Sequence, residues 1–266
     1  MLRVETDDGI RLVVEARGAP RSPLVLFLNS IGCDRTLWDL QFEALEGGYR
    51  CLAFDARGHG QSDVPPGDYT IERLGRDALA VLDAVDVASA HLCGLSLGGL
   101  VAQWLAVHAP RRVASLTLAN TASRIGSYDS WEARRLRVLE AGLGSIAGMA
   151  IERFFSAAFR TDHPQFVEDY RTRFARGAAV GYAGCCAALR DADLTPELAR
   201  IAAPTLVIGG AFDVSTPPAE AEALAAGIRG ARLRLLSAGH LSNREQPAAF
   251  TAALQGHIAT EQAGRS

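Results

Sequence analysis

A serine in a glycine-rich turn is the first residue of this chain that could do chemistry. Ser96 lies in Gly94-Leu95-Ser96-Leu97-Gly98-Gly99, which matches the pattern G-x-S-x-G. An apolar run over 90–93 precedes the motif, and apolar residues at helical spacing over 97–108 follow it. A strand, a sharp turn and a helix are the setting in which such a serine acts as a nucleophile. A side chain at Gly94 or Gly98 would collide with neighbouring backbone in that turn.

The same six residues have a plainer interpretation, in which Ser96 only caps a glycine-rich helix. Short motifs recur by chance, so the motif needs partners elsewhere in the chain. A serine hydroxyl is a weak nucleophile that requires a base, and the base requires an orienting carboxylate. The presence of a base and a carboxylate at suitable positions would therefore favour the nucleophile over the helix cap.

Asp213 and His240 supply the two missing groups in the expected order. Asp213 follows the apolar run 205–208, and His240 follows the run 231–236. Serine, acid, histidine is the chain order of hydrolases that carry this turn. Because parallel strands end at one rim of a sheet, we expect both side chains beside Ser96. We predict Ser96 as nucleophile, His240 as general base and Asp213 as the carboxylate that orients it.

Other residues compete for these roles. His59 also follows a core run, but it lies in the turn-rich segment 55–62, which we interpret as structural. Asp213 has the alternative interpretation of a turn or helix-cap residue, and Asp191 and Asp193 are weaker candidates for the acid. The remaining histidines are expected away from the rim, and they are His91, His108, His163 and His257.

Acyl transfer also requires backbone donors for the negatively charged oxygen that develops. Each such donor contributes about 3–4 kcal/mol. We predict the amide of Leu97 as one donor, because it follows the nucleophile. The other is expected from the segment 29–32, called here the oxyanion loop, with Ile31 first and Ser30 second. Gly32 allows the backbone there to turn its donors inward.

The pattern of apolar runs predicts the fold that positions these groups. The runs 24–28, 51–54, 113–119 and 205–208 are continuous, as in parallel strands buried on both faces. Alternation over 10–16 indicates a half-exposed strand that pairs with 2–5 at an antiparallel edge. Helices are expected between the runs, over 37–45, 71–85, 97–108, 219–228 and from 247. We predict an α/β fold with a mostly parallel, eight-stranded sheet flanked by helices.

One region interrupts this alternation. Residues 123–195, called here the cap, show helical patterning over 131–143, 146–159 and 165–176, with many arginines and no convincing strand. We interpret the cap as an insertion over the carboxyl ends of the sheet, where clefts form in open α/β sheets. The core then consists of residues 1–122 and 196–266.

Composition excludes several classes of protein. The chain has 266 residues, 48% of them hydrophobic and 21% charged, with net charge −3, so we expect no nucleic-acid partner. It contains no bilayer-length apolar run and no signal-peptide core near its first residue, so no membrane association is expected. Five cysteines without metal-ligand spacing indicate reduced thiols and a cytoplasmic protein. Adjacent Cys185 and Cys186 have the less favoured alternative of a redox switch. No cofactor or metal is expected, and the oligomeric state is left open.

The chain resembles the α/β-hydrolases over nearly its whole length, and within them the 3-oxoadipate enol-lactonases of aromatic-compound degradation. The loop over 55–67 and the motif around Ser96 are shared across the superfamily. Further matches are Asn29-Ser30-Ile31-Gly32, the stretch 69–77 and Leu118-Ala119-Asn120-Thr121-Ala122. The more specific matches are the cap stretch over 181–193 and His240-Leu241-Ser242-Asn243.

The resemblance implies a substrate, a small enol lactone with a free acetate arm, opened to 3-oxoadipate through an acyl-enzyme. An arginine can hold such a carboxylate with two hydrogen bonds. We predict Arg134 for this role with Trp131 lining the pocket, against the alternative of an exposed arginine and a core tryptophan. Ser30 is the third residue that we expect to contact the substrate. A carboxylesterase, a perhydrolase or a C–C bond hydrolase would use the same three residues. A ligand-binding protein without turnover is the less favoured alternative.

Overall fold

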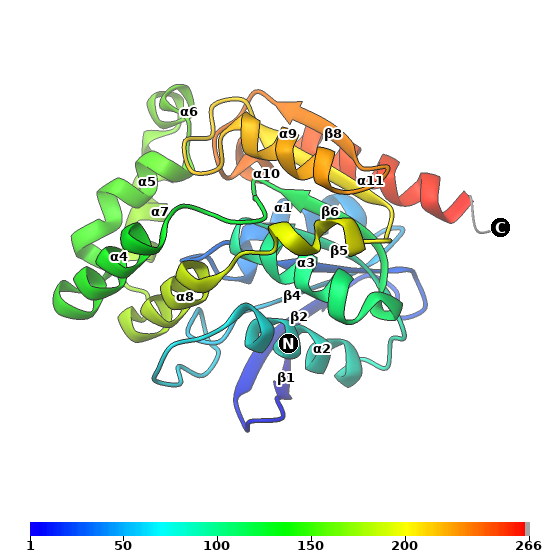
Figure 1. The fold of residues 1–266 in the computed structure, drawn as a ribbon, viewed down its shortest axis with the longest axis horizontal. Coiled ribbons are helices and arrows are strands. Elements are labelled where there is room, and N and C mark those ends of the chain that lie inside the picture. Colours follow the sequence, from blue (N-terminus) through cyan, green and yellow to red (C-terminus); the bar gives the residue numbers. More distant parts are fainter. Residues whose placement is uncertain (264–266) are drawn as a thin grey trace.

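The computed structural model describes residues 1–263, and its centre is an eight-stranded sheet (Figure 1). The spatial order of the strands is β1-β2-β4-β3-β5-β6-β7-β8. The first two pairings, β1 with β2 and β2 with β4, are antiparallel, and all the others are parallel. The predicted mostly parallel sheet is confirmed. The strands are β1 (Leu2–Glu5), β2 (Arg11–Arg17), β3 (Leu24–Leu28), β4 (Arg50–Phe54), β5 (Ala90–Leu95), β6 (Val113–Ala119), β7 (Thr205–Gly210) and β8 (Arg232–Leu236).

Helices cover both faces of the sheet (Figure 1). The α-helices are α1 (Asp39–Leu45), α2 (Ile71–Ala84), α3 (Leu97–His108), α4 (Tyr128–Ala141), α5 (Ala147–Phe154), α6 (Ala157–Asp162), α7 (Pro164–Ala175), α8 (Ala179–Asp191), α9 (Pro218–Gly227), α10 (Ser242–Glu245) and α11 (Pro247–Ala263). α1 packs with α11 on one face, while α2 and α3 pack together on the other. Right-handed crossovers require this split where the strand order reverses beside β3.

The central strands are buried along their whole length, as their apolar runs predict. Every residue of β3, β5, β6 and β7 is buried. The edge strand β8 differs, because only its last residue, Leu236, is buried. The loops after β3, β5, β6, β7 and β8 therefore extend from a rigid core, and these loops carry the predicted site residues.

The cap lies between β6 and β7 and forms the lobe to the left of the sheet in Figure 1. It contains α4, α5, α6, α7 and α8. The single helix expected over 146–159 is wrong, because the chain breaks at Phe155 and Ser156. Ser156 caps α6 by accepting the amide of Phe159 at 3.2 Å. Its own amide and hydroxyl donate to Glu245 of the core at 2.7 Å each.

α8 is a cap helix that the pattern of apolar residues did not single out. Its buried residues are mostly small, from Gly181 to Ala188. A Cβ atom at Gly181 would collide with the backbone of Gly58 in the core. The amide of Tyr69 donates to the carbonyl oxygen of Gly184 at 3.1 Å. α8 is thus the cap helix that packs directly on the loops after β4.

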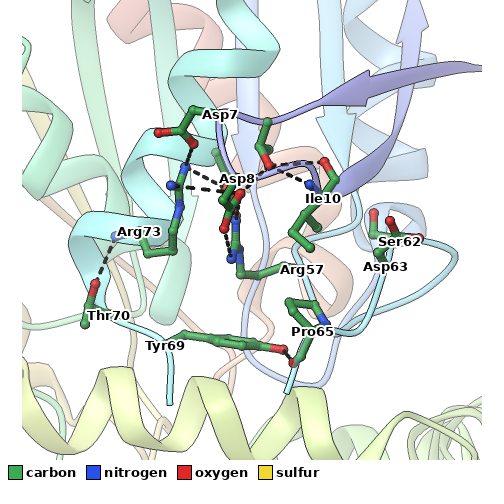
Figure 2. Close-up of polar contacts among 12 residues, drawn as sticks. Asp7, Asp8, Ile10, Arg57, Ser62, Asp63, Pro65, Tyr69, Thr70 and Arg73 are labelled. Atoms are coloured by element: carbon green, nitrogen blue, oxygen red, sulfur yellow. Dashed lines mark hydrogen bonds and ion pairs between the residues drawn. The ribbon is translucent and has the colours of Figure 1, made fainter. Parts of the chain in front are cut away.

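A charge network fixes those loops to the N-terminal hairpin. Figure 2 shows Arg57 and Arg73 converging on Asp7 and Asp8. The Arg57 guanidinium makes two hydrogen bonds to Asp8, at 2.9 and 3.0 Å, and two to Asp77, at 2.6 and 2.7 Å.

Within residues 1–263, no helix is long and apolar enough to cross a bilayer.

Candidate active site

Ser96 lies at the turn between β5 and α3 in a backbone conformation that few residues adopt. Its φ and ψ are 57° and −116°, which is a strained combination for a residue with a side chain. The turn is held by the Ser96 amide, which donates to the carbonyl oxygen of Ala119 at 3.0 Å. A Cβ atom at Gly94 would meet the backbone of Gly98, and one at Gly98 would meet that of Leu28. The predicted need for glycine at both positions is confirmed.

Asp213 and His240 meet at the rim where β7 and β8 end. Nδ1 of His240 lies 2.8 Å from Oδ2 of Asp213, and both side chains are buried. Burial would raise the pKa of Asp213. The charge of His240 and hydrogen bonds from His240, Asn120 and Thr216 outweigh this effect and lower the pKa to about 2. Asp213 is therefore an anion at neutral pH, suited to orient and stabilise an imidazolium.

Asn120 supports this carboxylate, although the sequence analysis gave it no role. Its side-chain amide donates to Oδ2 of Asp213 at 3.0 Å and to the Gly239 carbonyl oxygen at 3.2 Å. The Ser242 hydroxyl donates to Oδ1 of Asn120. Asn120 has φ of 44°, a left-handed value that asparagine tolerates better than most residues. Its position directly after β6 was the available signal, because that strand ends at the same rim.

Ser96 and His240 line one small cavity between core and cap. Its volume is about 90 Å³. Within the described part of the chain, the Ser96 hydroxyl has no hydrogen-bond partner, so it is open to this cavity. Phe154 stacks against His240 with ring centroids 6.4 Å apart and planes 8° apart. The full lining is Ile31, Ser96, Ile125, Gly126, Ser130, Trp131, Arg134, Ala150, Arg153, Phe154, Tyr182, Ser215 and His240.

A larger cavity, of about 410 Å³, lies between core and cap and shares only Tyr182 with this lining. It contains His59 rather than Ser96 or His240. Nε2 of His59 accepts the amide of Gly32 at 2.9 Å. The smaller cavity, not this one, is lined by both Ser96 and His240, and the structure gives His59 a contact with the oxyanion loop.

Two backbone amides next to Ser96 remain available as donors. Within residues 1–263, the amides of Leu97 and Ile31 make no hydrogen bond, whereas those of Gly98 and Gly32 do. The Gly98 amide donates to the Asn29 carbonyl oxygen at 3.0 Å, and Gly32 donates to His59. Ile31 lines the cavity. Unsatisfied donors at a helix start are rare unless water or a ligand meets them.

The predicted substrate contacts divide into two groups. Trp131 and Arg134 line the cavity, with the Arg134 guanidinium 4.5 Å from the centroid of the tryptophan ring. Trp131 also donates its Nε1 hydrogen to the carbonyl oxygen of Ile125 at 2.6 Å. Ser30 is only 2% exposed and does not contribute to the cavity wall. Arg153, which the sequence analysis did not select, contributes instead.

The competing residues have other partners. Asp191 bonds to Arg190, and Asp193 accepts the amide of Thr195. None of the remaining histidines lines the cavity of Ser96. His91 lies beside Ser115, His108 beside Glu197, His163 beside Phe159, and His257 beside Arg232.

Within residues 1–263, no three histidine, cysteine, aspartate or glutamate side chains lie together as a metal site would require. All five thiols are free and buried. Burial raises the pKa of Cys186 to about 12 and also raises that of Cys185. Such protonated, inaccessible thiols are poor candidates for a redox switch.

Proteins named as enol-lactonases and as an esterase are similar to this chain over most of its length. The alpha/beta hydrolase fold family matches residues 23–247. The chain is 42% identical to 3-oxoadipate enol-lactonase 2 of Acinetobacter baylyi, over 90% of this chain and 89% of that protein. The enol-lactonase from Burkholderia xenovorans matches with a TM-score of 0.94 at 36% identity, over 97% of this chain and 100% of that one. A malate-bound thermophilic esterase from Thermogutta terrifontis matches with a TM-score of 0.92 at 32% identity, over 98% of both chains.

The family match and the enol-lactonase match each cover most of the chain, and the sheet has the predicted eight strands. The predicted resemblance to the α/β-hydrolases and to the enol-lactonases is confirmed. The chain therefore belongs to the alpha/beta hydrolase fold family, and it is a hydrolase similar to the 3-oxoadipate enol-lactonases.

Proposed function

We propose that this protein opens 3-oxoadipate enol-lactone to 3-oxoadipate, with Ser96, His240 and Asp213 as its catalytic residues. The observation that carries the proposal is the pairing of His240 with Asp213 at 2.8 Å, beside a cavity that also exposes Ser96. The names of the enol-lactonases that are similar to the chain support the substrate.

In the first half of the reaction, Ser96 Oγ attacks the lactone carbonyl carbon while His240 takes the hydroxyl proton. The amides of Leu97 and Ile31 donate to the oxyanion. The carbon–oxygen bond of the ring then breaks, and the enol oxygen leaves with the proton that His240 returns. Delocalisation of the negative charge in the enolate makes it a good leaving group, and the released enol tautomerises to a ketone.

In the second half, His240 removes a proton from water, and the hydroxide attacks the acyl-enzyme. Collapse of the intermediate returns the proton to Ser96 and releases the new carboxylate. Asp213 keeps the hydrogen of His240 on Nδ1 throughout, so Nε2 is the base. The reaction needs only water besides the lactone, and no cofactor has a role in it.

The free carboxylate of the substrate would lie against Arg134, beside the Trp131 ring. Two parallel hydrogen bonds from a guanidinium match a carboxylate better than an ammonium does. We place the reaction in aromatic-compound degradation and in the cytoplasm, where five free, buried thiols would remain reduced.

A second candidate function is hydrolysis of acyclic carboxylic esters that carry a free acid. The similar esterase, whose structure has malate bound, favours this alternative. The same three residues would serve, because an ester and a lactone present the same carbonyl group. The two functions differ in which substrate is turned over most efficiently.

Steady-state kinetics on 3-oxoadipate enol-lactone, beside neutral and acidic aryl esters, tests the proposal. We expect the highest kcat/KM for the lactone, and a loss of at least about 10³-fold in kcat for Ser96→Ala. Higher kcat/KM for the acidic aryl ester would favour the second candidate. Equal, negligible turnover by wild type and Ser96→Ala would mean a binding protein and would overturn both.

A further inference from the structure

Four arginines of the cap form ion pairs with carboxylates within residues 1–263, namely Arg124, Arg135, Arg171 and Arg190. Arg135 bonds to Asp68 and Glu132 at 3.0 Å each, and Arg171 bonds to Glu168. Arg190 binds three carboxylates, those of Asp68, Glu132 and Asp191. Such pairs explain why a helical surface can carry so many guanidinium groups.

Arg134 on α4 and Arg153 on α5 are two of the cap arginines outside this group. Within residues 1–263 neither forms an ion pair with an acidic side chain, although both are half-buried. Both line the cavity of Ser96 and His240. Two cations that are partly removed from water without an anion between them are unfavourable unless a ligand supplies one.

The two guanidinium groups also act on each other. Burial lowers the pKa of Arg153, and the positive charge of Arg134 lowers it further. Like charges repel, and a carboxylate that binds both guanidinium groups would offset this repulsion. Tyr182 closes the same wall, and its hydroxyl also faces Arg134 and Arg153.

The pair stands where two cavities meet. An outer cavity of about 320 Å³ shares Ser130, Arg134 and Arg153 with the cavity of Ser96. The inner cavity is about 90 Å³, well below the roughly 300 Å³ at which small-molecule sites begin. A substrate whose carbonyl carbon reaches Ser96 must therefore extend toward this junction.

We propose that Arg153 and Arg134 form one site for the carboxylate of the substrate, so that Arg153 determines specificity for anionic esters and lactones. The assignment of the bound carboxylate to the substrate rests on the proposed function. The site itself requires only an anionic ligand of suitable length, and it can be tested without the lactone.

The experiment compares Arg153→Met with wild type on a matched pair of esters. The acidic member is the mono-4-nitrophenyl ester of succinic acid, and the neutral member is 4-nitrophenyl butyrate. We expect kcat/KM for the acidic ester to fall about 10- to 100-fold, the loss of a charge-assisted contact. For the neutral ester it should stay within about twofold, which also reports that the variant folds.

The direction of the change separates this proposal from a site formed by Arg134 alone. If Arg153 made no contact with the ligand, removing it would only relieve its repulsion of Arg134, and kcat/KM for the acidic ester would stay equal or rise. Either result would overturn the proposal. Arg134→Met combined with Arg153→Met should cost less than the sum of the single losses, because both guanidinium groups bind one carboxylate.

Two controls complete the design. Arg171→Met removes one positive charge from the cap without touching either cavity, and it should leave the preference for the acidic ester unchanged. Arg153→Lys keeps the charge but loses the planar fork, so we expect only partial recovery. Full recovery with lysine would show a non-specific positive field and would also overturn the proposal.

The outcome for the anion site is distinguishable from that for the proposed function. Turnover of the lactone with an unchanged preference in Arg153→Met would refute the paired site and leave the proposed function standing. Loss of the preference without any turnover of the lactone would refute the proposed function and leave the paired site standing.

Discussion

A buried histidine outside the catalytic set fixes the backbone that carries a predicted oxyanion donor. Nε2 of His59 accepts the amide of Gly32, the residue after Ile31. We expect His59→Leu to lower kcat about tenfold with little change in KM, because the oxyanion loop loses its anchor and a buried amide loses its acceptor. Steady-state kinetics measures this split. His59→Gln, which retains an acceptor, should recover part of the loss, and an unchanged kcat in His59→Leu would contradict the assignment.

The burial of His59 makes stability depend on pH in a defined direction. Burial lowers the pKa of His59, although hydrogen bonding to the Arg57 carbonyl oxygen and the charges of Asp55 and Asp34 oppose this. The folded state therefore prefers neutral imidazole, and the contribution is fully present above the unfolded pKa of about 6.5. It is lost as the pH falls below that value, because the unfolded chain binds the proton first. In urea unfolding at several pH values, the free energy of unfolding should decline less steeply with falling pH in His59→Leu than in the wild type.

The sequence predicted single residues where a motif or strand end signalled them. Ser96, Asp213 and His240 could be selected because each follows an apolar run that ends at one rim. Asn120 also follows such a run, but a neutral amide has no distinctive place in a motif. Arg153 could not be distinguished from other cap arginines, because its lack of an anionic partner is a property of the packed helices.

At the level of elements, continuous apolar runs were sufficient to predict β3, β4, β6 and β7, alternation predicted β2 with β1 as its partner, and helix spacing was sufficient for α2 and α3. α8 was not predicted because its buried residues are alanine, glycine and cysteine, which give little contrast between its faces. The break between α5 and α6 was missed because its cause, the bond from Ser156 to Glu245, joins residues far apart in the sequence.

The small residues of α8 allow the cap to approach the core closely, which gives a prediction at this scale. Gly181→Ala should destabilise the protein by about 1–3 kcal/mol, the usual cost of overpacking, because its Cβ would collide with the Gly58 backbone. It should also raise KM, since Tyr182 on the same helix lines the cavity. Gly256→Ala, in α11 with open space around it, should stabilise by about 0.5–1 kcal/mol. Thermal unfolding compares the two, and equal effects would contradict this account of α8.

On the scale of the whole molecule, the cap, the core loops and the N-terminal hairpin depend on one buried arginine. Arg57 binds Asp8 of the hairpin (Figure 2). It also binds Asp77 of α2, and its loop carries Gly58 against α8. The hydrogen bond from Arg57 lowers the pKa of Asp8 against the opposing effect of burial. Burial outweighs the arginine at Asp77 and raises its pKa. The positive charge of Arg57 thus partly offsets the cost of burying the Asp77 carboxylate, and the same guanidinium holds the turn between β1 and β2 through Asp8.

Arg57→Met should therefore cost about 3–5 kcal/mol of unfolding free energy at pH 7, because Asp77 becomes a buried charge without its main partner. The loss should shrink as the pH falls toward 4. Protonation removes the unpaired charge of Asp77 in the variant, while in the wild type the contribution of Asp8 is lost below its unfolded pKa of about 3.9. Urea unfolding at several pH values measures both effects. Adding Asp77→Asn to the variant should restore part of the stability at pH 7, and a loss that is independent of pH and unaffected by Asp77→Asn would show that Arg57 contributes through packing rather than charge.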